Sequence, residues 1–170
     1  MKVVFVSMCK KPAERMHLDP SVVYRCVNIA RQLRVRGHDV QLFHADALPD
    51  RVAADVVILH RPRASRAFSR IRRRLAGTLQ VCDFDDLLFD SSAVDEHPAY
   101  LSGVASRTRI LEDTERYREA LTSVGRSFIS TPELREAFGR VEPALHGYVV
   151  RNGWDESWRA VGEMCPAAEV

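Results

Sequence analysis

The chain opens with Met1-Lys2-Val3-Val4-Phe5-Val6-Ser7, and the apolar run Val3–Val6 within it decides the fold class. A continuous β-branched and aromatic run is typical of a strand that is buried on both faces of a parallel sheet. Residues 21–36 have apolar side chains at spacings of three and four, follow Asp19-Pro20 and are closed by Gly37, which predicts an amphipathic helix. Further apolar runs at residues 40–43, 56–59 and 79–84 predict three more strands.

The rest of the chain continues this alternation of strands and helices. We predict helices at residues 64–76 and 104–124, a strand at 127–130, a helix that starts at Thr131-Pro132 and a last strand at 148–150. Parallel strands need crossover connections, which helices usually provide, so we expect an α/β domain with a Rossmann-like, doubly wound and mainly parallel sheet. We assign residues 1–158 to this single domain and residues 159–170 to an irregular tail or the start of a linker.

Composition and missing motifs exclude several classes of protein. The 170 residues are 46% hydrophobic and 28% charged with a formal net charge of +2, as in an ordinary globular domain. Four scattered cysteines without a C-x-x-C pair argue against a zinc ribbon or a disulfide scaffold. Neither a signal peptide nor a membrane-spanning apolar stretch is evident, so we expect a cytoplasmic protein. The first strand is not followed by a glycine-rich phosphate loop, which disfavours dinucleotide dehydrogenases and P-loop NTPases.

The most distinctive segment is Val81-Cys82-Asp83-Phe84-Asp85-Asp86-Leu87-Leu88-Phe89-Asp90. Its four carboxylates follow or end a predicted strand, where an α/β sheet binds its ligand. Carboxylates there can accept hydrogen bonds from sugar hydroxyl groups, and one with a raised pKa can act as a general base. The alternative is that the aspartates cap a following turn or helix. The D-x-D spacing also permits a metal site, but further hard ligands are not evident, and we predict none.

A basic segment, residues 61–74, contains seven arginines. On a helix, Arg63, Arg66, Arg70 and Arg74 share one face, which predicts docking to an anionic membrane surface or to a phosphorylated, lipid-linked substrate. A solvated helix face is the alternative. Nucleic acid is disfavoured, because no stacking aromatic residues interleave the arginines. His60 precedes this segment at the end of a predicted strand, where it either faces a pocket or is a structural hydrogen-bonding residue.

Several short motifs follow one another in a set order. They are the helix with Tyr24-Arg25, then Arg36-Gly37-His38-Asp39-Val40, Asp55-Val56-Val57-Ile58, the acidic segment 83–90, Phe128-Ile129-Ser130-Thr131-Pro132-Glu133-Leu134 and Val149-Val150-Arg151-Asn152-Gly153-Trp154-Asp155. This ordered set resembles the N-terminal domain of family 4-type glycosyltransferases of the GT-B fold and covers residues 1–158. In two places the chain departs from the family. Asp19-Pro20-Ser21-Val22 stands where members commonly have a Gly-Gly turn, and Asp85 stands where many have a histidine.

The resemblance implies a retaining transferase whose N-terminal domain holds the acceptor, while a second domain binds a nucleotide-sugar donor and supplies an E-x7-E signature. We therefore expect the acceptor half of a cytoplasmic enzyme, peripheral at the inner face of the membrane, that acts on a cell-envelope glycan or glycolipid. The donor half would come from missing sequence or a partner subunit, and we expect no cofactor in this chain itself. The residues expected to act are Asp85 and Asp86 in polar recognition or proton transfer, Arg25, His60, Asp83 and Asp90 in substrate binding, and Arg63, Arg66, Arg70 and Arg74 in surface docking.

Two other functions fit the same sequence. One is a non-catalytic Rossmann-like module that binds a partner protein, and the other is a small nucleotide-binding regulatory domain, which the missing phosphate loop disfavours. A single domain of this type can also expose apolar surface, which predicts self-association into a homo-oligomer.

Overall fold

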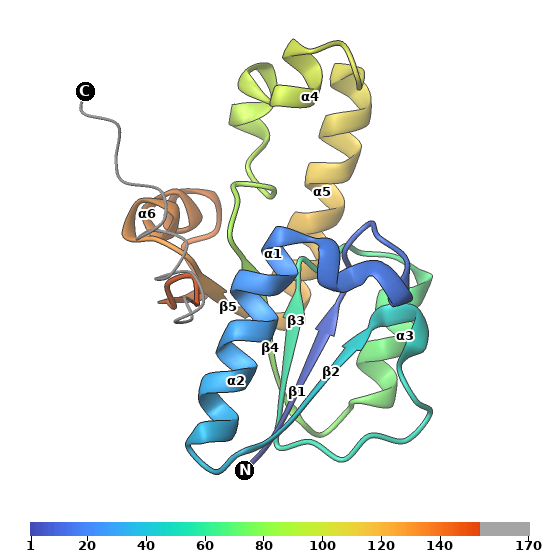
Figure 1. The fold of residues 1–170 in the computed structure, drawn as a ribbon. Helices are drawn as coiled ribbons and strands as arrows, with labels where there is room; N and C mark the ends of the chain where they lie inside the picture. The colour runs from blue at the N-terminus through green and yellow to red at the C-terminus, as the bar shows by residue number, and fades with distance from the viewer. Residues whose placement is uncertain (154–170) are drawn as a thin grey trace, which may run out of the picture.

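One parallel sheet organises the protein, whose structure is a computed structural model that describes residues 1–153. Six strands lie in the order β2-β1-β3-β4-β5-β6, and each neighbouring pair is parallel (Figure 1). The strands are β1 (Lys2–Ser7), β2 (Asp39–His44), β3 (Val56–His60), β4 (Leu79–Phe84), β5 (Arg126–Ile129) and β6 (His146–Val149). This arrangement confirms the predicted Rossmann-like, doubly wound α/β fold.

Helices connect the strands. The α-helices are α1 (Pro20–Val22), α2 (Asn28–Val35), α3 (Arg66–Arg74), α4 (Pro98–Leu101), α5 (Arg107–Val124) and α6 (Pro132–Val141). Three 3-10 helices, η1 (Ala13–Leu18), η3 (Ala45–Ala47) and η4 (Ser91–Glu96), lie in the loops, and a π-helical turn, η2 (Val23–Val27), joins α1 to α2.

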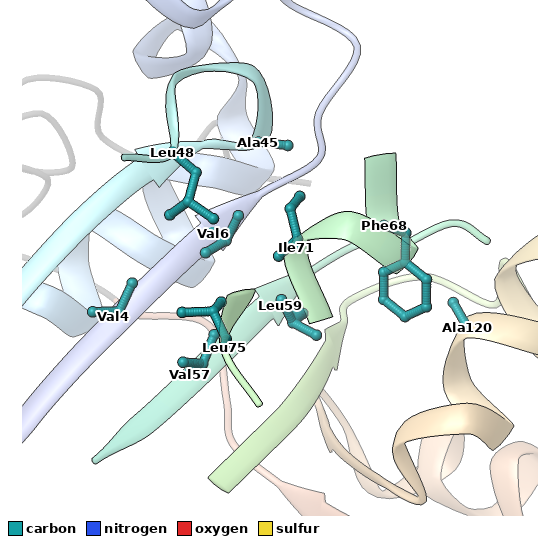
Figure 2. Packing of buried hydrophobic residues seen from close by; sticks show 10 residues of the cluster. All are labelled: Val4, Val6, Ala45, Leu48, Val57, Leu59, Phe68, Ile71, Leu75 and Ala120. Atoms are coloured by element: carbon teal, nitrogen blue, oxygen red, sulfur yellow. The ribbon is translucent and has the colours of Figure 1, made fainter. Parts of the chain in front are cut away.

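The core has a layer on each face of the sheet, because neighbouring residues of a strand point to opposite sides. On one face, Val4 and Val6 of β1 pack with α3 and with Ala120 of α5 (Figure 2). On the other face, Val3 and Phe5 pack with α1, η2 and α2. All four β1 side chains are buried, which confirms the prediction that this strand is covered on both sides.

Side-chain caps set where several helices begin. The hydroxyl group of Ser65 accepts a hydrogen bond from the Phe68 amide, so α3 begins at Arg66, two residues later than predicted. Ser106 caps α5 in the same way, which places its start at Arg107 instead of residue 104. Thr131 caps α6 at the predicted Thr131-Pro132 start.

Two features of the fold differ from the sequence-based expectation. The helix predicted over residues 21–36 contains the π-helical turn η2, whose Arg25 and Cys26 are buried. The segment after β4, for which we predicted no helix before residue 104, forms η4 and α4 and stands clear of the sheet together with the start of α5 (Figure 1). The expected tail and the end of the expected domain, residues 154–170, lie outside the described residues. Within residues 1–153, no helix is both long and apolar enough to cross a membrane.

Candidate functional site

The candidate site lies where the strand order changes direction. β1 pairs with β2 on one side and with β3 on the other, so the connections after β1 and β3 leave the sheet in different directions. Open α/β sheets bind ligands in the crevice at this point, outside the carboxyl ends of the strands. Ser7 ends β1 and His60 ends β3, and the two residues are register partners in the sheet.

A chain of hydrogen bonds links these strand ends to the acidic loop. Ser7 Oγ lies 3.1 Å from His60 Nδ1, and Ser21 Oγ lies 2.8 Å from His60 Nε2. Ser21 Oγ also donates to Asp85 Oδ2 at 2.6 Å. Because the Ser21 hydroxyl has one proton and gives it to a carboxylate, we assign the ring proton of His60 to Nε2. His60 Nδ1 then accepts from the Ser7 hydroxyl group, so each hydrogen bond in the chain has one donor and one acceptor.

His60 is a neutral, structural member of this chain. Its side chain is completely buried, and burial lowers its pKa to about 4, although the nearby Asp85 carboxylate acts in the opposite direction. Both ring nitrogens are occupied by serine hydroxyl groups. From the sequence, His60 was either a pocket residue, for which we expected substrate binding, or a structural hydrogen-bonding residue. The structure places it beneath the site, where it orients Ser21.

Arg61 holds the two aspartates that we expected to carry the chemistry. Its Nε donates to Asp85 Oδ1 at 2.8 Å, and its terminal nitrogen donates to Asp86 Oδ2. Arg61 has a φ of 48°, the one positive φ of a non-glycine residue within the described chain, and its amide donates to the Asp83 carbonyl oxygen at 2.9 Å. A left-handed arginine costs on the order of 1 kcal/mol or more, and the ion pairs to two carboxylates offset this strain.

The two aspartates have different proton affinities. Burial raises the pKa of Asp85, but hydrogen bonds from Arg61 and Ser21 outweigh it and leave the pKa below its ordinary value. Burial and the charge of Asp85 raise the pKa of Asp86. The side chain of Asp86 is 58% exposed, whereas that of Asp85 is 11% exposed. Asp86 is therefore the accessible and more basic carboxylate, and Asp85 is a fixed anion behind it.

Arg25 and Asp83, which we predicted to bind substrate, bind each other. Their side chains are 0% and 1% exposed, and Arg25 Nε donates to Asp83 Oδ2 at 3.1 Å. One terminal nitrogen of Arg25, Nη2, also donates to Asp83 Oδ1. The other, Nη1, donates to the Val150 carbonyl oxygen and, at 3.3 Å, to Asn152 Oδ1. Burial raises the pKa of Asp83 to about 6 against the hydrogen bonds and charge of Arg25. Through Arg25, the turn η2 therefore contacts both Asp83 and the segment after β6.

A pocket of about 540 Å³, the acidic pocket, opens next to Asp86. Asp86 and Asp90 form part of its wall, and Asp90 also accepts a hydrogen bond from the Ser92 amide at 2.8 Å, so it caps η4 as well. The other lining residues mix charged and apolar side chains; they include Lys10, Leu87, Leu88, Val94, Glu96, His97, Arg109, Ile110, Asp113, Thr114 and Tyr117. Polar and apolar groups in one concave surface can bind a ligand that has both hydroxyl groups and a carbon skeleton.

The basic segment divides into paired and unpaired arginines. Arg63 lies before α3 and forms an ion pair of 2.8 Å with Asp113, and Arg74 forms one of 2.6 Å with Asp50. Arg66 and Arg70 instead line a separate hollow between α3 and α5. The four arginines predicted to form one docking face therefore include two that are tied to aspartates of other elements.

Sequence reasoning missed Ser7, Ser21 and Arg61, although each stands next to a strand end or helix start that it had located. Their positions at strand ends and at a helix start were the signal that could have identified them as site residues. Which of them meet, however, depends on the order of the strands in the sheet. Among residues 1–153, no three His, Cys, Asp or Glu side chains come together in a group that could hold a metal ion. No protein-family model matches the sequence, and no curated protein matches it either.

Proposed function

We propose that this domain is the acceptor-binding half of a glycosyltransferase and that the acidic pocket holds a hydroxyl-rich acceptor. The observation that supports this most is the position of Asp86, an accessible carboxylate with a raised pKa at the wall of a pocket beside the switch point of the sheet. Carboxylate oxygens accept hydrogen bonds from sugar hydroxyl groups, and Leu87, Leu88 and Tyr117 offer apolar surface for the carbon face of a sugar ring. The motif resemblance supports the same proposal.

Asp86 would act as the general base of the transfer. The acceptor oxygen forms a bond to the anomeric carbon of the donor, the bond between that carbon and the donor phosphate breaks, and the acceptor proton passes to a carboxylate oxygen of Asp86. A base works best with a pKa near the working pH, which favours Asp86 over Asp85. Asp85, held by Arg61 and Ser21, positions the loop that carries Asp86. The nucleotide-sugar donor would bind a second domain, in further sequence or in a partner subunit.

The binding half of this proposal is tested on the isolated chain by saturation-transfer NMR with a panel of methyl glycosides of hexoses and 6-deoxyhexoses. We expect at least one glycoside to bind, and Asp86→Asn together with Asp90→Asn to weaken that binding at least fivefold, because carboxylates accept hydroxyl hydrogen bonds better than amides do. Asp39→Asn, an exposed aspartate at the start of β2, serves as the control and should leave binding unchanged. Absence of binding across the panel, or equal weakening in the control, would contradict the proposal.

The catalytic half is tested with partners captured from the native cell extract and a nucleotide-sugar transfer assay on the assembly. Loss of a general base typically costs about 100-fold or more in kcat. We expect that loss for Asp86→Asn, with KM for the acceptor changed far less, and no loss for Asp39→Asn. A transfer-competent assembly in which Asp86→Asn keeps full kcat would show that Asp86 is not the base.

A second candidate function, a module that binds a second copy of the chain, is favoured by one surface feature. Tyr100, Leu101 and Val104, near the end of the projecting segment, are 39%, 70% and 81% exposed. Clustered apolar side chains at a surface are typical of interfaces. Light scattering of the wild type and of Leu101→Ser with Val104→Ser tests this function, which predicts a dimer that the substitutions convert to a monomer. A wild-type monomer at high concentration would exclude it.

A further inference from the structure

The hollow between α3 and α5, the basic hollow, has a lining with a net positive charge. Its volume is about 750 Å³, and four guanidinium groups frame it, those of Arg66, Arg70, Arg72 and Arg73. Phe68 and Glu119 also line it, together with four small residues, Ala64, Ser69, Ala76 and Ser123. None of its lining residues belongs to the acidic pocket, so the two are separate sites.

Within residues 1–153, most of the positive charge of the basic hollow has no acidic partner. Arg66, Arg70 and Arg73 form no hydrogen bond or ion pair with side chains of residues 1–153, and Glu119 is the single acidic residue in the lining. The flanking Arg63 and Arg74, by contrast, each pair with an aspartate. Three unpaired cations at spacings of four and three on one helix repel one another, and an anion between them would relieve that repulsion.

One arginine is already held in position. Arg72 Nε donates to Gln80 Oε1 at 3.1 Å, and its guanidinium carbon lies 5.9 Å from the centre of the Phe68 ring. These contacts restrict the side chain before any ligand arrives, so less conformational entropy is lost on binding. Phe68 is buried under the hollow and cannot stack on a nucleic acid base, which argues against a nucleic acid ligand.

We propose that the basic hollow binds the phosphate groups of a multiply charged ligand such as a pyrophosphate or a phosphomonoester. Guanidinium groups donate paired N–H bonds that match phosphate oxygens, and a charge of at least −2 matches the uncompensated arginines. A carboxylate with a single charge would leave most of that positive charge in place. This inference does not depend on the glycosyltransferase proposal, because no residue of the acidic pocket takes part.

Isothermal titration with inorganic pyrophosphate tests the site directly. We expect saturable binding of one equivalent that is stronger than binding of sulfate at the same ionic strength. Arg66→Ala with Arg70→Ala should weaken it at least tenfold. Arg135→Ala with Arg140→Ala removes the same charge from exposed positions on α6 and should change binding less than twofold. Equal weakening in both pairs, or no preference over sulfate, would overturn the proposal.

Two further experiments distinguish a specific phosphate site from a merely charged surface and identify the source of the phosphate. Arg66→Lys with Arg70→Lys keeps the charge but removes the paired donors, and full pyrophosphate binding by this variant would overturn the proposal. Cosedimentation with phosphatidylcholine vesicles that contain phosphatidic acid then tests a lipid source. A lipid-borne phosphate at this site is supported if the protein binds the vesicles, if pyrophosphate displaces it from them, and if Arg66→Ala with Arg70→Ala abolishes the binding. Pyrophosphate binding without vesicle binding supports a soluble phosphorylated ligand.

Discussion

A single hydroxyl group, that of Ser21, connects the interior of the sheet to the acidic loop. It accepts a hydrogen bond from His60 at 2.8 Å and donates one to Asp85 at 2.6 Å. Because the hydroxyl can do both only when the ring of His60 carries a proton on Nε2, the protonation of a buried histidine decides to which partner the Ser21 hydroxyl donates. Protonation of His60 would place a second proton on the ring, and Ser7 could no longer donate to Nδ1.

The pH dependence of stability follows from this arrangement. The pKa of His60 falls from 6.5 to about 4 on folding, so between these values the unfolded chain binds a proton that the folded chain does not. Stability from neutral His60 is therefore complete above pH 6.5 and is lost as the pH falls toward 4. We expect the free energy of unfolding of the wild type, relative to His60→Gln, to rise by roughly 3 kcal/mol across that window.

Urea denaturation of both proteins at a series of pH values measures this difference. Asp83, whose pKa is about 6, changes stability in the opposite direction over part of the same range, but it is present in both proteins and cancels in the comparison. A difference that stays constant from pH 4 to 7 would contradict the assignment of His60 as buried and neutral.

At the scale of elements, the pair of Arg25 and Asp83 joins three parts of the chain. Arg25 lies in the π-helical turn η2, Asp83 lies in β4, and the same guanidinium group reaches the segment that follows β6. π-helical turns widen a helix locally and are frequent where a side chain has a special task. Here the turn contains a completely buried cation whose partners lie outside its own helix.

Removal of one partner should be costly, because the other is left as an unpaired buried charge. We expect Arg25→Met to lower the free energy of unfolding by about 3–5 kcal/mol, and Arg25→Met with Asp83→Leu to recover more than half of that loss. Urea denaturation of the single and double variants measures both values. Arg63→Met, which breaks a partly exposed pair with Asp113, is the matched control and should cost about 1 kcal/mol or less. An Arg25→Met cost no greater than the control would exclude a stabilising role for the buried pair.

At the scale of the whole molecule, strand pairing and burial are greatest in the middle of the sheet. β1 and β3 are paired on both sides and covered by helices on both faces, whereas β6 lies at an edge and its residues are half-buried or exposed. The carboxyl ends of β1, β3 and β4 carry the candidate site, so it rests on the most protected strands.

Hydrogen exchange should follow this gradient. We expect the amides of β1 and β3 to exchange only through global unfolding and those of β6 to exchange at least tenfold faster, because an edge strand opens locally at lower free energy. Exchange followed by NMR or mass spectrometry measures the rates. Uniform protection from β1 to β6 would contradict local opening at this edge.

The elements themselves follow from local sequence. The apolar run at residues 79–84 predicts a strand, and β4 has those same bounds, because side-chain periodicity and turn residues act over a few neighbouring positions. The acidic loop was likewise found from sequence, since Asp85 and Asp86 directly follow that strand. The assignment to the glycosyltransferases rests on short motifs and stays a prediction.

The sequence by itself determined the alternation of strands and helices and hence the doubly wound sheet. Only the tertiary structure decided which polar residues meet. Arg25 and Asp83 are 58 positions apart, and they meet because the turn η2 packs on the sheet that contains β4. Ser7 and His60 are 53 positions apart, and they meet because β1 and β3 are neighbours in that sheet. Local patterns specify which face of an element is apolar, whereas the partner of a buried charge depends on which elements pack together. For this reason Arg25 and Asp83, predicted to bind substrate, instead bind each other inside the protein.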